Sequence, residues 1–167
     1  MTRIHRLLSA QGKHMRARVL AAGIVSAALS VTPAFATVLI KDDYGGKMVD
    51  YRARFQQIRR SGEPVVIDGI CMSACTMILG IVPLDHSCVT PRAVLGFETA
   101  WEYDNSGTRI VSVSGTQELM KVYPASVHAW ITRHGGLGSK ILLLKGRELT
   151  SIVPRCRNAS RAASGRF

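Results

Sequence analysis

The sequence has few aromatic residues and no internal repeat. Trp, Tyr and Phe make up only 6% of the 167 residues, so the core must be mostly aliphatic. No heptad pattern and no repeat with a period of about 20–50 residues is present, which excludes a coiled coil and a solenoid. Charged residues make up 20% and hydrophobic residues 47%, a balance that excludes a disordered chain. The length suits one compact domain, with at most a tail.

Acidic residues are scarce, and none occurs in the first 36 residues. Five basic residues precede an uncharged run at residues 19–31. Ala34-Phe35-Ala36 follows, with small residues at the −1 and −3 positions of a cleavage site after residue 36. This order predicts a secretory signal peptide over residues 1–36. An uncleaved anchor helix is the alternative, but the run is shorter than the ~20 residues that a membrane span needs. We therefore expect a periplasmic or secreted protein.

Removal of residues 1–36 changes what the net charge of +11 implies. Five bases and no acid leave, so 17 bases and 11 acids remain, a net charge of +6. Four of these bases lie in residues 155–167, which contain no acid and predict a basic flexible tail. Such a tail could make weak contact with an anionic surface. No aromatic residues interleave with its arginines, so we expect no specific nucleic-acid partner.

All four cysteines, Cys71, Cys75, Cys88 and Cys156, follow the predicted signal peptide. In an oxidising compartment four thiols most often form two disulfides. Of the three pairings, the one that contains Cys71–Cys75 is the least expected, because it joins neighbours across one short turn. Cys75–Cys88 with Cys71–Cys156, or the crossed alternative, would fasten the tail to the core.

Short β-branched runs alternate with helical patterns from residue 38 onward. The predicted strands cover residues 38–40, 65–67, 88–90 and 93–97, with a hairpin around residues 104–107. The predicted helices cover residues 47–60 and residues 73–80, followed by a longer helical stretch. This stretch begins at a capping box, Ser114-x-x-Gln117, and ends at Gly135, and Pro124 splits it. Residues 141–144 fit either a helix or a strand. The alternation predicts an α/β fold with a largely parallel sheet.

Ser73 is the strongest candidate for chemistry. It follows a predicted turn at Asp68-Gly69 and opens a helix of small residues. Backbone N–H groups at the start of a helix have no partner within it, and with the helix dipole they favour a developing oxyanion. A serine hydrolase needs this geometry, although a plain N-cap serine would also fit. Gly45-Gly46 could bring a second N–H close to a substrate, or could be an ordinary turn.

The order of these elements, with the segment C-M-S-A-C-T-M-I-L at residues 71–79, resembles the ClpP/crotonase superfamily over roughly residues 38–100. The resemblance implies a ClpP/crotonase-like βαβ spiral with a mostly parallel sheet. It also implies that Ser73 is the nucleophile and that the backbone N–H groups of Gly46 and Ala74 are the oxyanion donors. The histidine base of such enzymes falls within residues 94–98, where this chain has Glu98.

A carboxylate is a weaker base than an imidazole, so Glu98 would need burial or an acidic compartment to act as the base. A Ser–Lys pair is the other route that the resemblance implies, with Lys121 or Lys140 as the candidate lysine. Glu148 lies in the stretch where a third catalytic member would be expected.

Two functions are consistent with this sequence. The first is an exported ClpP-like serine hydrolase that acts on a peptide or acyl substrate, with Ser73 as nucleophile and Glu98 as an atypical base. The second is a catalytically inactive protein of the same fold, a pseudoenzyme, that serves as a periplasmic binding or assembly module. The resemblance implies no cofactor and suggests a homo-oligomer. His86, His128 and His134 have no metal-ligand spacing, so we expect no metal.

Overall fold

The computed structural model describes residues 36–157. The predicted signal peptide, apart from Ala36, and residues 158–167 of the predicted tail lie outside the described residues. Among residues 36–157, every helix is too short or too polar to cross a lipid bilayer.

The described part of the chain forms a mixed α/β fold with mostly parallel strand pairing, as predicted. One sheet has the order β1-β2-β4, with both pairs parallel. A second has the order β3-β5-β8, in which β3 runs parallel and β8 antiparallel to β5. The third is the hairpin β6–β7. The strands are β1 (Val38–Ile40), β2 (Val65–Ile67), β3 (Ile70–Met72), β4 (Ser87–Val89), β5 (Val94–Phe97), β6 (Trp101–Tyr103), β7 (Arg109–Val111) and β8 (Leu142–Lys145).

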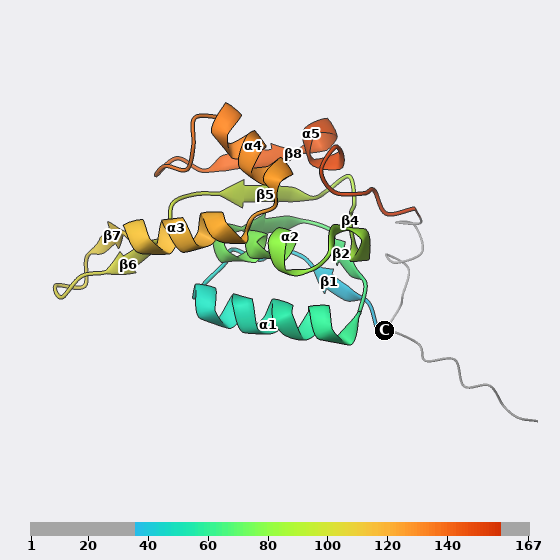
Figure 1. Cartoon of the computed structure of the whole chain (residues 1–167), viewed down its shortest axis with the longest axis horizontal. Helices are drawn as coiled ribbons and strands as arrows, with labels where there is room; N and C mark the ends of the chain where they lie inside the picture. The colour runs from blue at the N-terminus through green and yellow to red at the C-terminus, as the bar shows by residue number, and fades with distance from the viewer. Residues whose placement is uncertain (1–35, 158–167) are drawn as a thin grey trace, which may run out of the picture. The chain divides into compact units, whose positions relative to one another are not determined.

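Helices lie on opposite sides of the strands (Figure 1). In that view α1 runs along one side, α4 and α5 lie on the other, and the hairpin β6–β7 projects beyond α3. The helices are α1 (Met48–Ser61), the 3₁₀ helix η1 (Ser73–Met77), α2 (Ile78–Ile81), the 3₁₀ helix η2 (Leu84–His86), α3 (Val113–Val122), α4 (Ala125–Arg133) and α5 (Gly146–Thr150).

The helix α1 forms where its periodicity predicted it. Phe55 and Ile58 are buried, so the apolar stripe faces the core while the arginines lie off it. The helix ends at Gly62, which adopts a φ of 71° and donates its N–H to the Ile58 carbonyl at 3.1 Å.

The long C-terminal helical stretch is split at Pro124 into α3 and α4, as predicted. Five large apolar residues of this stretch are buried in the core: Leu119, Tyr123, Val127, Trp130 and Ile131. The predicted capping box at Ser114 is wrong. The helix begins at Val113, and the hydroxyl of Ser112 accepts the Gly115 N–H at 3.2 Å.

The disulfides join Cys71 to Cys75 and Cys88 to Cys156, so the preference against the Cys71–Cys75 pair was wrong. The chain turns sharply between the end of β3 and η1, which brings the Cys71 and Cys75 Cα atoms to 5.3 Å. All four cysteines are paired, which fits an oxidising compartment.

The Cys88–Cys156 disulfide fastens the end of the described chain to β4. Arg155 forms a bridge with Val89, and the Cys156 N–H donates to the Val89 carbonyl at 3.1 Å. Arg155 and Cys156, which the sequence placed in a flexible tail, are therefore attached to the core.

Candidate functional site

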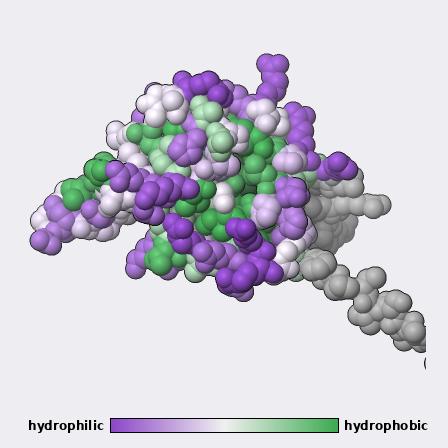
Figure 2. Space-filling model, viewed as in Figure 1, coloured by the Kyte–Doolittle hydropathy of each residue, from purple (hydrophilic) through white to green (hydrophobic). Residues whose placement is uncertain are grey.

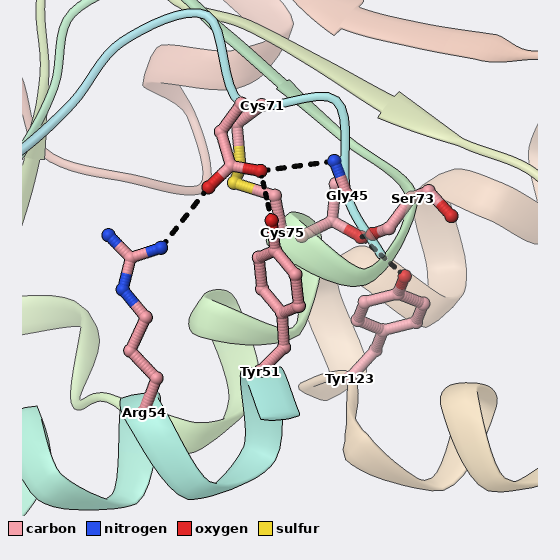
Figure 3. The surroundings of a disulfide bond; sticks show 9 residues. Gly45, Tyr51, Arg54, Cys71, Ser73, Cys75 and Tyr123 are labelled. Carbon is pink, nitrogen blue, oxygen red and sulfur yellow. Dashed lines mark hydrogen bonds and ion pairs between the residues drawn. A yellow bond between two sulfur atoms is a disulfide. The ribbon is translucent and has the colours of Figure 1, made fainter. Parts of the chain in front are cut away.

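Ser73 occupies a sharp turn at the end of β3. Its φ of 51° lies in the left-handed region, which costs a residue other than glycine about 1–3 kcal/mol. The Cys71–Cys75 disulfide spans the turn, and the Ser73 side chain points away from it (Figure 3). The Thr76 hydroxyl donates to the Ser73 carbonyl at 2.6 Å and lies 2.6 Å from the Tyr123 hydroxyl. These contacts hold Ser73 in its strained conformation.

The turn at Gly45-Gly46 lies directly against Ser73 and Ala74. Gly45 has a φ of 85°, and a Cβ there would meet the Met72 carbonyl oxygen and the Ser73 Cβ, both at 2.8 Å. It would also lie 3.0 Å from the Ala74 nitrogen. Within residues 36–157, neither the Gly46 nor the Ala74 backbone N–H donates a hydrogen bond to another residue. The glycine pair therefore approaches the Ser73 turn closely, and both proposed donors are free of hydrogen-bond partners among the described residues.

Ser73, Ala74 and Gly46 line one open pocket with a volume of about 490 Å³, which is in the size range of small-ligand sites. Its wall includes apolar side chains from α1, from α3 and from the hairpin. The other lining residues are Lys47, Met48, Ala100, Trp101, Glu102, Tyr103, Ser112, Gly115 and Leu119. Figure 2 shows hydrophobic residues on the projecting part of the molecule that holds the hairpin.

Glu98 lies at the matching end of the neighbouring strand but does not meet Ser73. Met72 pairs with Gly96 in the β3–β5 register, so Glu98 follows β5 at the same edge of the sheet as Ser73. Its carboxylate instead lies 3.5 Å from the Arg109 guanidinium, which also stacks over the Trp101 ring at 4.2 Å. Glu98 and Arg109 line a separate pocket of about 440 Å³. The structure brings together Ser73, Ala74 and Gly46, and it does not bring Glu98 to them.

The other candidate bases also lie elsewhere. Lys121 pairs with Glu118 at 2.7 Å, and His134 lies 3.6 Å from Glu148. His128 contacts the Met120 carbonyl at 2.7 Å. None of these side chains, nor Lys140 or His86, lines the described pocket at Ser73.

Lys47 is the lysine that lines this pocket, and nothing in the sequence pattern had marked it as a candidate. It is the N-cap residue of α1, directly after Gly46. Its place immediately after the glycine pair was the signal that could have identified it.

Among residues 36–157, no three His, Cys, Asp or Glu side chains cluster in a way that could hold a metal ion. No protein-family model matches the chain, and no curated protein matches it. The geometry of the pocket therefore provides the evidence on function.

Proposed function

We propose that this protein is an exported, ClpP/crotonase-like module that binds an aliphatic group carried on a carbonyl, without hydrolysing it. An acyl chain and an apolar residue of an extended peptide both have this chemistry. One observation carries the proposal: Ser73 and two free backbone N–H groups line an apolar pocket, while Glu98 pairs with Arg109 outside it.

Each part of the pocket suits a part of such a ligand. An aliphatic chain in contact with Met48, Ala74 and Leu119 would gain about 0.8 kcal/mol for each buried methylene. The carbonyl oxygen would accept the Gly46 and Ala74 N–H groups, each adding about 1 kcal/mol. Because no base among the described residues is hydrogen-bonded to the Ser73 hydroxyl, the hydroxyl keeps its proton and lacks the rate gain of about 10²–10⁴ that proton transfer supplies. The pocket therefore favours binding over turnover.

Fluorescence titration with two probes tests the proposal: a dansylated C11 fatty acid and a dansylated apolar hexapeptide amide. We expect saturable binding of at least one probe, and the probe that binds identifies the source of the carbonyl. Ala100→Trp should fill the pocket and weaken binding by about tenfold or more. Ala53→Trp, on the exposed face of α1, is the matched control and should bind as the wild type does. Absence of saturable binding, or equal binding by the Ala100→Trp variant, would contradict the proposal.

A serine hydrolase is the second candidate, because Lys47 lines the same pocket as Ser73 and could act as its base. A fluorophosphonate probe, applied from about pH 4.5 to 10 to span the titration of carboxyl, imidazole and amine groups, separates the two functions. The binding module predicts no labelling that depends on Ser73. Labelling that Ser73→Ala and Lys47→Gln abolish, and that Lys121→Gln leaves intact, would establish the hydrolase instead.

A further inference from the structure

Asp43 connects the glycine turn to the strand that leads into Ser73. Its backbone N–H donates to the Ile70 carbonyl at 2.8 Å, and its carbonyl accepts the Met72 N–H at 2.8 Å. These two bonds bracket Cys71 on β3, so the main chain of Asp43 is fixed directly beside the Ser73 turn.

The Asp43 carboxylate accepts three donors from two different segments, and Figure 3 labels the donor residues Gly45, Tyr51 and Arg54. One oxygen accepts the Gly45 N–H at 3.0 Å and a short hydrogen bond from the Tyr51 hydroxyl. The other lies 3.3 Å from the Arg54 guanidinium. Tyr51 and Arg54 are three residues apart on α1, so the carboxylate links the glycine turn to this helix.

Tyr51 also limits where Gly46 can lie. A Cβ on Gly46 would be 3.3 Å from the Tyr51 ring, so the ring packs closely against this residue. Burial, the hydrogen bond to Asp43 and the nearby Asp43 charge raise the pKa of Tyr51 to about 12. Its hydroxyl therefore remains a donor at neutral pH.

We infer that Asp43 is a positioning residue that holds the Gly45-Gly46 turn against Ser73 and Ala74 and so fixes the Gly46 wall of the pocket. Tyr51 and Arg54 in turn hold the Asp43 carboxylate. The inference deepens the proposed function and rests on it for its consequence in binding, while the position of the turn can be measured without any ligand.

A carboxylate suits this position better than an amide. An asparagine oxygen could accept from Gly45 and Tyr51, but its NH₂ group would face the Arg54 donors and its charge would be absent. The loss of order in an Asp43→Asn variant should be confined to the glycine turn, because α1 keeps its buried Phe55 and Ile58 and β3 keeps its pairing with β5.

Amide hydrogen exchange by NMR tests the positioning in the Asp43→Asn variant. We expect exchange at Gly45, whose N–H donates to the Asp43 carboxylate, to accelerate by about tenfold or more, with no change at Val66 or Leu95. Asp42→Asn is the matched control, because the neighbouring Asp42 side chain is exposed and donates or accepts no hydrogen bond within the described residues. Unchanged exchange at Gly45, or an equal acceleration at every amide, would overturn the inference.

Titration of the same variants with the dansylated probes tests the consequence for the pocket. Asp43→Asn should weaken binding by about tenfold, and Tyr51→Phe and Arg54→Gln should each weaken it less. A change in exchange at Gly45 with unchanged probe affinity would overturn the role of Asp43 in the pocket. Failure of the wild type to bind either probe would refute the proposed function, while the exchange data would still decide whether Asp43 positions the turn.

Discussion

At the scale of single residues, Ser73 is notable for its backbone before its side chain. A left-handed φ on a residue other than glycine is maintained only where its surroundings impose it, and such residues gather at functional sites. Here the disulfide, the Thr76 hydroxyl and the approach of Gly45 all act on the same turn. The strain at Ser73 is therefore a cost in stability that a purely structural turn could avoid with glycine.

Replacing Ser73 by glycine should raise the free energy of unfolding by about 1 kcal/mol, because glycine adopts the left-handed region without the steric cost that serine bears. Urea unfolding measures the change. Ser126→Gly, at an exposed position in α4, is the matched control and should lower stability by about 1 kcal/mol or less. A destabilised Ser73→Gly variant would show that the serine side chain stabilises the turn.

The sequence located one half of the site and not the other. That Ser73, Ala74 and Gly46 lie together was implied by the resemblance to the ClpP/crotonase superfamily, in which a glycine pair precedes the serine at a similar separation. The engagement of Glu98 by Arg109 could not be predicted, because it depends on where the hairpin lies relative to the end of β5. Lys47 and Asp43 were missed for the same reason, since their roles come from tertiary contacts.

At the scale of secondary-structure elements, the two disulfides constrain segments of very different length. Cys71–Cys75 closes a separation of four residues around Ser73, and Cys88–Cys156 closes one of 68 residues between β4 and the end of the described chain. The first constrains a local turn, whereas the second restricts the whole unfolded chain.

Removing the long-range disulfide should lower the free energy of unfolding by more than removing the local one. Loop-closure entropy gives about 4 kcal/mol for the Cys88–Cys156 pair and about 2 kcal/mol for the Cys71–Cys75 pair. Double cysteine-to-alanine variants, compared by urea unfolding, measure both losses. A larger loss from the Cys71–Cys75 pair would mean that local strain and packing outweigh chain entropy.

The start of α3 offers a second prediction at this scale. Ser112→Ala should lower stability by about 1 kcal/mol, because the buried Ser112 hydroxyl accepts the Gly115 N–H. The exposed Ser114 lies within the helix, so Ser114→Ala should change stability by less than about 0.5 kcal/mol. Thermal unfolding compares the two. A larger loss of stability from Ser114→Ala than from Ser112→Ala would show that Ser114 is the N-cap, as the sequence pattern predicted.

Elements with a clear period could be predicted, and short elements between turn residues could not. The helix α1 and the pair α3–α4 follow apolar periodicity, and β2 follows a β-branched run. The strand β3 was missed because Ile70–Met72 is only three residues long and lies between Gly69 and Ser73. Residues 141–144 were ambiguous because a short apolar run fits both periods, and antiparallel pairing with β5 makes them a strand.

At the scale of the whole molecule, the Asp68 carboxylate links the ends of the two parallel strands β2 and β4. Asp68 follows β2, accepts the Thr90 hydroxyl at 2.6 Å and pairs with Arg92 after β4. Although burial alone would raise it, the hydrogen bonds from Thr90 and Arg92 hold the pKa of Asp68 below its ordinary value of 3.8.

This shift predicts how stability depends on pH. Because the pKa of Asp68 is lower in the folded state than in the unfolded chain, its contribution is present above about pH 4 and is lost as pH falls through the folded value. Asp68→Asn should be less stable than the wild type by about 1 kcal/mol at pH 7, and the gap should narrow below about pH 4. Urea unfolding across this range measures the gap, with Asp85→Asn as a control for the loss of one exposed carboxylate. A gap that stays constant with pH would contradict the assignment.

If the pocket at Ser73 holds an aliphatic group carried on a carbonyl, a photoreactive ligand should label its wall. Photoaffinity labelling with a diazirine-bearing fatty acid and a diazirine-bearing apolar hexapeptide, followed by peptide mapping, measures this. We expect one of these probes to crosslink to the segments that wall the pocket, residues 46–48, 100–103 and 112–119, and Ala100→Trp to abolish these crosslinks. Crosslinks from both probes that fall elsewhere, or that persist in the Ala100→Trp variant, would contradict this expectation.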